Sequence, residues 1–333
     1  MSDVAKEAGV SAATVCRALK ADPRVTVETR ERVCAVARAM GYSLDPLLSA
    51  FASRKRGSRK GTDVTVIAFV SKFSGPMQWR KNPYYRRMFD GAQARAGQLG
   101  YRLENFWLGE PGMSSGRLSR ILQHRGISAV FVAPMPRVRS HISLEWAKFT
   151  SITVGYSLLR PKMNRVSSHL FHGILTSIRE LRRDGCQRIG FCIHRETSKR
   201  LDNIPLAAFQ LAQSLYPDVA FSSFLFDDAN SGSIPKWCRK NRLEVLIGAE
   251  PEILQVLRRS GLYPGKVGYA TASWNHEEPE IAGLDQLPDQ IGAKAVELLI
   301  GQLQRIEFGL PALACTTMVE GEWRRGQSLR RCL

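Results

Sequence analysis

From residue 62 onward, the chain alternates between short apolar runs and amphipathic stretches. The runs have the length of strands and are rich in β-branched and aromatic residues, whereas the stretches carry apolar side chains at helical spacing. Strands that are apolar on both faces belong in a parallel sheet covered by helices. We expect strands at 64–70, 129–133, 152–155, 189–193, 245–248 and 267–269, and helices at 83–99, 116–124, 171–183, 206–215, 251–259 and 290–303. The pattern therefore predicts a doubly wound α/β fold.

The order of these elements predicts two similar lobes. A first series of strand and helix units ends near Tyr156, and a second ends near Leu284. The last helix follows Leu287 and Pro288, and we expect it to cross back to the first lobe. Residues 62–333 are therefore predicted to form one two-lobed domain.

The first 42 residues have a different pattern. Val4 and Ala8 mark a short helix, Gly9 supplies a turn that a residue without a Cβ makes easily, and Ser11 stands where an N-cap belongs. A second helix follows, and a third begins after the N-cap candidate Thr26. The third helix is expected to bury a stripe of Val33, Val36, Ala37 and Met40, and the expected core of the unit is Val4, Ala8, Val15, Leu19, Val33 and Ala37. Two short helices joined by a glycine turn are typical of a helix-turn-helix, although a three-helix bundle that binds nothing has similar spacing.

The residue identities favour the DNA-binding interpretation. Asp3-Val4-Ala5 through Ala8-Gly9-Val10-Ser11 and Thr14-Val15-Cys16-Arg17, followed by a segment that ends at Gly41-Tyr42, resemble the DNA-binding headpiece of the lactose-repressor (LacI-type) family of bacterial transcription regulators. The chain departs from the family pattern at Cys16 and Lys20, where Ser and Asn are usual. The resemblance implies contacts to base edges by Ala12, Ala13 and Arg17, and contacts to phosphates by Thr14 and Tyr42. Arg17 suits a bidentate contact to guanine, and the alanines offer only methyl groups.

Residues 43–61 correspond to the hinge helix and basic linker of that family. In the family this helix orders on the operator, and an apolar side chain wedges into a base step from the minor groove. The resemblance gives that role to Phe51, with Leu48 beside it. Arg54 and Lys55 open a run with five positive charges in seven residues, which we expect to contact phosphates. A solvated basic linker is the alternative. The net charge of +18 agrees with a polyanionic partner.

The two-lobed domain resembles the periplasmic-binding-protein-like sensor domain of the same family. The matching segments include 82–101, 266–269 and 281–296. Such a domain holds a small molecule between its lobes, at the carboxyl ends of the strands. The candidate effector-binding residues follow expected strands or lie near them: Phe73, Trp79, Tyr84, Tyr85, Arg200, Asp202, Glu250, Trp274 and Asn275. The chain departs from the family pattern for sugar contacts at Pro205, Ala249-Glu250 and Ala270.

Other classes of site have weak support. The sequence lacks the phosphate-loop, dinucleotide-binding and HExxH motifs, so we expect no enzyme and no cofactor. His169 and His172 have a spacing that can hold a metal, but no Cys or carboxylate cluster accompanies them in the sequence, which favours surface or capping histidines. The seven cysteines form no CxxC pair, and no apolar run reaches membrane-spanning length. These features predict a cytoplasmic protein without a membrane partner.

The sequence predicts a homodimeric transcription regulator, expected to be a repressor. Two headpieces would bind the half-sites of a near-palindromic double-stranded operator, because the symmetry of the dimer imposes that of the DNA. Control would come from a small-molecule effector, such as a sugar or a related metabolite. One alternative is a DNA-bound regulator with a vestigial cleft that answers to partner proteins or to abundance. The other is an enzyme with an appended DNA-binding domain.

Overall fold

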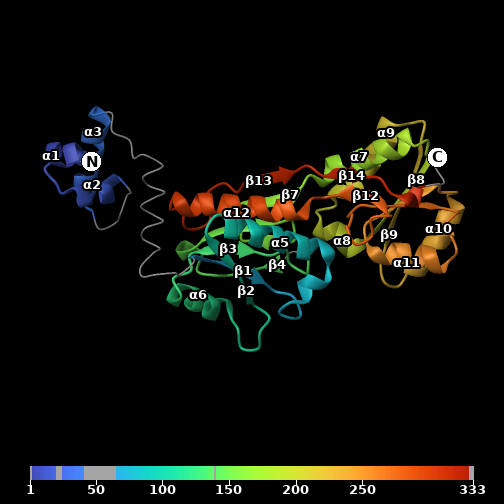
Figure 1. Cartoon of the computed structure of the whole chain (residues 1–333), viewed down its shortest axis with the longest axis horizontal. Coiled ribbons are helices and arrows are strands. Elements are labelled where there is room, and N and C mark those ends of the chain that lie inside the picture. Colours follow the sequence, from blue (N-terminus) through green and yellow to red (C-terminus); the bar gives the residue numbers. More distant parts are fainter. Residues whose placement is uncertain (1, 20–24, 41–64, 139, 330–333) are drawn as a thin grey trace. The chain divides into compact units, whose positions relative to one another are not determined.

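The computed structural model describes residues 2–19, 25–40, 65–138 and 140–329. The chain divides into two compact units, residues 1–63 and 64–333 (Figure 1). Within the described part, no helix combines the length and the apolar character needed to cross a membrane.

The described residues of the N-terminal unit, 2–19 and 25–40, form three short helices: α1 (Ser2–Glu7), α2 (Ala12–Leu19) and α3 (Val27–Ala39). Gly9 turns the chain between the first two in a left-handed conformation, with φ of +64°. Ser11 Oγ then accepts the amide N–H of Thr14 at 3.1 Å, which caps the start of α2. The buried core is Val4, Ala5, Ala8, Val15, Ala18, Val25, Val33 and Ala37. Met40 was expected on the buried stripe of the third helix but is 47% exposed, because α3 has ended at Ala39.

The first lobe is built on a six-stranded sheet in the order β13-β7-β5-β3-β1-β2. Its pairs are all parallel. Its strands are β1 (Thr65–Ser71), β2 (Tyr101–Trp107), β3 (Ala129–Val132), β5 (Thr150–Val154), β7 (Arg165–Ser168) and β13 (Thr316–Val319). α5 (Pro83–Gln98) and α12 (Pro288–Gln304) pack on one face, and α6 (Ser115–His124) packs on the other (Figure 1). Ile67 and Phe69 lie in one of these cores, and Ala68 and Val70 lie in the other.

The second lobe repeats this plan, with the strand order β14-β12-β11-β10-β8-β9. Its strands are β8 (Arg188–His194), β9 (Ala220–Phe226), β10 (Val245–Gly248), β11 (Gly268–Thr271), β12 (Ala282–Asp285) and β14 (Glu322–Arg324). β14 is antiparallel to β12. The helices are α7 (Leu170–Arg183), α8 (Arg195–Arg200), α9 (Ile204–Leu215), α10 (Ile234–Lys240) and α11 (Pro251–Arg259). Helices α7 and α9 cover one face of the sheet, and α10 and α11 cover the other.

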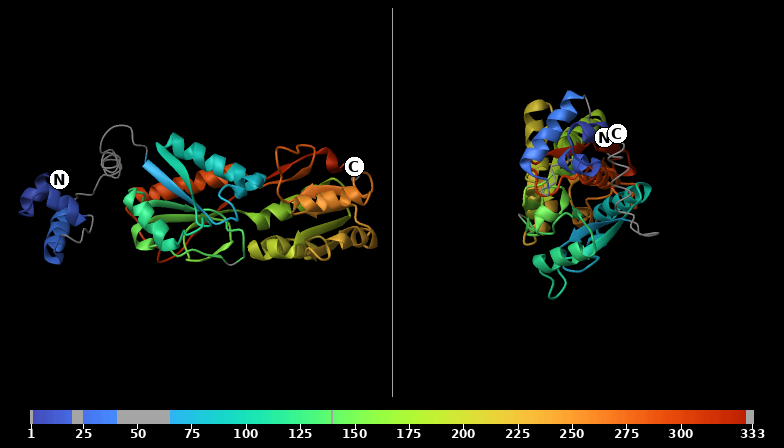
Figure 2. Two further views of the ribbon diagram at one scale, coloured as in Figure 1. Left: turned by 90° about the horizontal axis from the view of Figure 1, so that it is seen from below. Right: turned by 90° about the vertical axis from the view of Figure 1, so that its left-hand side faces the viewer.

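Smaller elements complete the unit. A short parallel pair, β4 (Ser140–His141) and β6 (Leu158–Arg160), stands apart from the two large sheets. Single 3₁₀ turns are η1 (Gln78–Lys81), η2 (Trp146–Lys148), η3 (Ser231–Ser233) and η4 (Gln327–Leu329). The two lobes follow one another along the long direction of the 64–333 unit (Figure 2).

The chain crosses between the lobes three times. It passes from β7 to α7, from β12 back to α12, and from β13 to β14. After the second crossing, α12 packs closely on α5 in the first lobe. A Cβ added at Gly292 of α12 would lie 2.0 Å from the carbonyl oxygen of Met88 on α5. A Cβ added at Gly91 of α5 would lie 2.2 Å from the carbonyl oxygen of Asp289 on α12. Each helix therefore needs a glycine at the contact.

The predicted fold class is confirmed, including the return of the last helix to the first lobe. The expected boundary near Tyr156 is wrong, because β7 extends the first lobe to Ser168. β7 and β2 are only partly apolar and were missed. The other missed strands of the two large sheets lie at or next to sheet edges: β9, β12, β13 and β14. The short pair β4 and β6 was also missed.

Candidate functional site

The second helix of the N-terminal unit presents its predicted contact residues to solvent. Ala12, Ala13 and Arg17 are exposed, and Thr14 is half-buried. The opposite face supplies Val15 and Ala18 to the core, so the exposed face of α2 is held on a packed support. Tyr42, Leu48, Phe51, Arg54 and Lys55 lie outside the described residues. A short helix with a free outward face is the geometry that enters a major groove.

A cavity of about 390 Å³ lies between the two lobes of the 64–333 unit. Its wall combines residues of both lobes, at the start of α5, in the second half of α8 and after strands β5, β10 and β11. Five of the predicted effector-binding residues line it: Tyr84, Tyr85, Arg200, Trp274 and Asn275. Sequence reasoning missed other lining groups, including Tyr156, Ser168, Tyr269, Thr271 and Gln286. This volume suits a small molecule.

Aromatic and cationic side chains meet at the first-lobe wall of the cavity. Asn82 caps α5 by accepting the amide N–H of Tyr84 at 2.9 Å, which presents both tyrosines at the helix start. Their rings pack edge to face with centroids 5.7 Å apart. Arg200 reaches from α8 of the second lobe and donates to the Tyr85 hydroxyl at 2.8 Å. Burial raises the pKa of the Tyr84 phenol well above its usual value, so Tyr84 stays a neutral donor.

Two ion pairs join the lobes beside the cavity. Arg87 on α5 bonds the buried carboxylate of Asp285 at 3.0 Å and Asp289 at 2.9 Å. Arg86 pairs with Glu277, which follows β11 in the second lobe. Both arginines lie on the helix that supplies Tyr84 and Tyr85. A change in the spacing of the lobes would therefore be transmitted to the cavity wall.

Four predicted effector residues lie elsewhere. Trp79 is 1% exposed in the first-lobe core, where it packs on Phe69 and Phe89 at centroid distances of 5.3 and 4.6 Å. Its polar sequence neighbours suggested an exposed loop, but η1 turns the indole inward. Phe73 packs against the same core and the ring of Tyr85.

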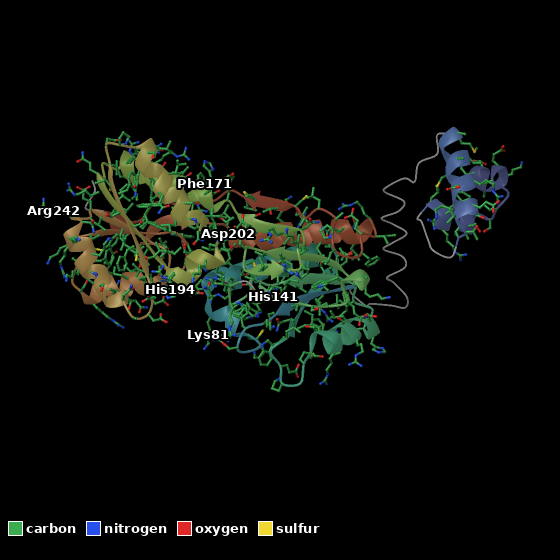
Figure 3. All side chains as sticks on the ribbon, turned by 180° about the vertical axis from the view of Figure 1, so that it is seen from behind. Lys81, His141, Phe171, His194, Asp202 and Arg242 are labelled. Atoms are coloured by element: carbon green, nitrogen blue, oxygen red, sulfur yellow. The ribbon has the colours of Figure 1, made fainter. Side chains whose placement is uncertain are left out.

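The other two are Asp202 and Glu250. Asp202 is exposed in a turn, with φ of +56°, and is not among the lining residues. Figure 3 labels it together with His194, where the second lobe approaches the first. Glu250 lies behind Ala249 and Pro251, which do line the cavity. Its two carboxylate oxygens each lie 3.1 Å from the amide nitrogen of His194. Burial raises the pKa of Glu250 to about 7, and the hydrogen bonds from Thr197 and from the His194 amide oppose this only in part.

The structure also shows where the residues lie that depart from the family pattern for sugar contacts. Pro205 and Ala249 line the cavity, whereas Ala270 is fully buried in the second-lobe core. These positions contribute no side-chain hydrogen-bonding group to the cavity wall. The polar groups of the wall come instead from Tyr84, Arg200 and other lining residues.

The structure alters the interpretation of two sequence patterns. His169 and His172 are accompanied by a carboxylate after all, because the pairing of β13 with β7 places Glu320 2.7 Å from the Nδ1 atom of each. Residues 112–116 have the spacing GxSxG, which sequence reasoning missed. Ser114 there accepts the amide N–H of Arg117 at 3.1 Å and caps α6, which accounts for the serine.

A family model described as bacterial regulatory proteins, lacI family, matches residues 1–45. Those residues contain the three-helix unit and its exposed second helix. Through this segment, the chain is similar to the lacI family. The match agrees with the resemblance carried by residues 3–17.

Comparisons beyond the headpiece give a relative and a shared fold. The chain is similar to the HTH-type transcriptional regulator GalR of Streptococcus thermophilus, with 24% identity over 198 residues. The match covers 59% of this chain and about half, 54%, of that relative. A lac repressor dimer bound to operator and the anti-inducer ONPF has the same fold (TM-score 0.56, 16% identity, 98% of each chain). A CelR–cellobiose complex also has this fold (TM-score 0.56, 18% identity, 98% of each chain).

The cavity thus lies between the lobes of a fold shared with these two solved structures. The relative and both neighbours carry the names of transcription regulators rather than enzymes.

Proposed function

We propose that the protein is a transcription repressor that binds operator DNA as a homodimer and is controlled by a small molecule bound between its lobes. The observation that carries this proposal is the combination of a lacI-family headpiece at residues 1–45 with a two-lobed unit that encloses a cavity. The headpiece provides DNA recognition, and the cavity provides a place for an effector.

DNA recognition is assigned to α2. Arg17 would bond a guanine edge, Ala12 and Ala13 would contact bases through their methyl groups, and Thr14 would contact a phosphate. Tyr42, Leu48, Phe51, Arg54 and Lys55 keep their predicted roles at the backbone and the minor groove. Because the alanines supply no hydrogen bonds, much of the specificity would come from Arg17 and from DNA shape.

The effector is assigned to the interlobe cavity, where Tyr84, Tyr85, Trp274, Arg200 and Asn275 would hold it. Tyrosine and tryptophan rings can stack on a sugar or related metabolite, and the phenol, guanidinium and amide groups can bond its polar atoms. Since Arg200 and Tyr85 come from different lobes, a ligand that bonds both favours one spacing of the lobes. Such differential binding shifts the population between DNA-binding states.

DNA recognition is tested by selecting operator sequences with the full-length protein and its Arg17→Ala variant. We expect the variant to lose discrimination at one base pair of each half-site, by about 1–3 kcal/mol. Lys6→Ala, at an exposed position on α1, is the control and should keep the wild-type base preference. An unchanged preference in the Arg17 variant would contradict the assignment.

Effector control is tested by a thermal-shift screen of sugars, nucleosides and small acids. A ligand present at about 100 times its Kd stabilises the folded unit by about 2.7 kcal/mol, which is a measurable rise in Tm. The same ligand should change operator affinity, and the rise should shrink in Tyr85→Ala. A screen in which no compound raises Tm would favour the vestigial cleft, with control through partner proteins or abundance.

A further inference from the structure

Three side chains that can bind a metal ion converge where two chain segments cross between the lobes. His169 and His172 belong to the crossing from β7 to α7, and Glu320 belongs to the crossing from β13 to β14. One ligand atom of each side chain lies within 4.8 Å of the others. None of the three is among the residues that line the effector cavity.

The backbone fixes this arrangement. β13 pairs with β7 in parallel, with Val319 opposite Ser168. The amide N–H of His169 continues this ladder by donating to Val319 O at 2.9 Å. His172 is three residues further on, so it faces the same side of the first turn of α7 as His169. The cluster is therefore positioned by strand pairing and a helix start.

The side chains face one another closely. Glu320 Oε1 lies 2.7 Å from His169 Nδ1, and Oε2 lies 2.7 Å from His172 Nδ1. The side chains of His169, His172 and Glu320 are 33%, 47% and 62% exposed, so an ion can enter from solvent. Two imidazole nitrogens and one carboxylate form a ligand set that binds Zn²⁺ and similar ions and leaves a position open for water.

We propose that His169, His172 and Glu320 form a site for Zn²⁺ or a similar divalent transition-metal ion. The ion would be bound by the two Nδ1 atoms and a carboxylate oxygen, in place of the hydrogen bonds that now join them. Because the ligands come from two of the three crossings, the bound ion ties these crossings together. This site is separate from the proposed effector site and does not depend on it.

Arg179 on α7 competes with the metal ion for His172. Its Nη2 atom lies 2.9 Å from His172 Nε2 and 2.9 Å from the Thr176 hydroxyl. A guanidinium only donates, so it fixes the proton of a neutral His172 ring on Nδ1, which then bonds Glu320. A metal ion on Nδ1 requires that proton on Nε2 instead. Arg179 must then release the ring, and its removal should strengthen metal binding.

The test is titration of the full-length protein with Co²⁺, followed by visible absorption, and then competition with Zn²⁺. We expect a site with nitrogen and oxygen ligands, whose bands are lost when Zn²⁺ is added. Glu320→Gln and His172→Gln should weaken Co²⁺ binding by about 10-fold or more. Arg179→Gln should strengthen it, since the glutamine oxygen can accept the Nε2 proton. His124→Gln, which removes an exposed histidine on α6, is the matched control and should change nothing.

Circular dichroism at each step confirms that the variants are folded. The proposal is overturned if Co²⁺ fails to bind, or if binding is the same in Glu320→Gln, His172→Gln and the His124 control. It is also overturned if thiolate-to-cobalt bands appear and disappear in Cys315→Ser, because a cysteine would then hold the ion. A weaker site in Arg179→Gln would contradict the role given to Arg179.

Discussion

Glu250 should make the stability of the two-lobed unit depend on pH. The carboxyl stands at the N-cap position of α11, behind the cavity wall, and burial raises its pKa from 4.5 to about 7. Burial is the main cause that raises the pKa values of Cys192 and Tyr269, and the nearby Glu250 carboxylate raises them further. The folded protein therefore prefers the neutral acid at pH values where the unfolded chain carries the anion.

The sign and the size follow from this difference. A group whose pKa is raised on folding contributes stability that is fully present below pH 4.5 and is lost as the pH rises through about 7. At 1.36 kcal/mol for each pH unit between the two values, the full loss is about 3 kcal/mol. Between pH 5 and pH 8, the loss is about 2–3 kcal/mol, because the unfolded carboxyl is already mostly ionised at pH 5.

Glu250→Gln isolates this effect, since the amide is uncharged and can still accept the N–H of His194 through its oxygen. The free energy of unfolding is measured for wild type and variant in urea, at pH 5 and at pH 8. Tryptophan fluorescence is suitable because the six tryptophans all lie between residues 79 and 323, so the signal reports only the two-lobed unit. We expect the difference between variant and wild type to move by about 2–3 kcal/mol in favour of the variant at pH 8.

Glu252→Gln is the control, because it removes the same charge at an exposed position on the same helix. Its difference from wild type should change little between the two pH values. The reasoning is refuted if Glu250→Gln behaves like this control. It is also refuted if the variant loses stability relative to wild type as the pH rises, since the folded state would then prefer the charged carboxylate.

Two further predictions concern packing. Gly292→Ala places a Cβ 2.0 Å from Met88 O and should destabilise the unit by about 1–3 kcal/mol, whereas Gly97→Ala, with no atom within 4 Å of its Cβ, should stabilise α5 by about 0.5–1 kcal/mol. Thermal melts that moved in the same direction for both would contradict the close contact of α5 and α12. Trp79→Ala should cost about 3–5 kcal/mol because the indole is buried in the core, and Trp274→Ala, at a partly exposed position on the cavity wall, should cost less. Equal losses in urea denaturation would refute the different placement of these two tryptophans.

Local patterns predicted the headpiece well, because its elements depend on neighbours in the sequence. Gly9 and Ser11 fix the turn and the cap within a few residues, and the core positions follow the helical period. The same holds for the central strands of both sheets, where both faces are apolar. The prediction that Met40 is buried was wrong, because the end of a helix depends on where the chain turns away.

The candidate site was predictable only in part. Tyr84 and Tyr85 line the cavity as expected, because Asn82 and Pro83 are local signals for a helix start. Trp79 was misplaced because its polar neighbours in the sequence suggest an exposed loop, whereas the indole packs with Phe69 of β1 and Phe89 of α5. That contact depends on how the strand, the turn and the helix pack together, which the sequence around Trp79 does not show.

The sequence by itself determined the kind of elements, the alternation that requires a parallel sheet, and the motif of the DNA-binding headpiece. These depend on backbone preferences and on the period of apolar residues, which act over a few positions. Only the tertiary structure decided which distant side chains meet. Glu320 is 148 residues from His172, and Arg200 is 115 residues from Tyr85. Each pair forms because strand pairing and the crossings between the lobes bring the segments together, and no local pattern records that contact.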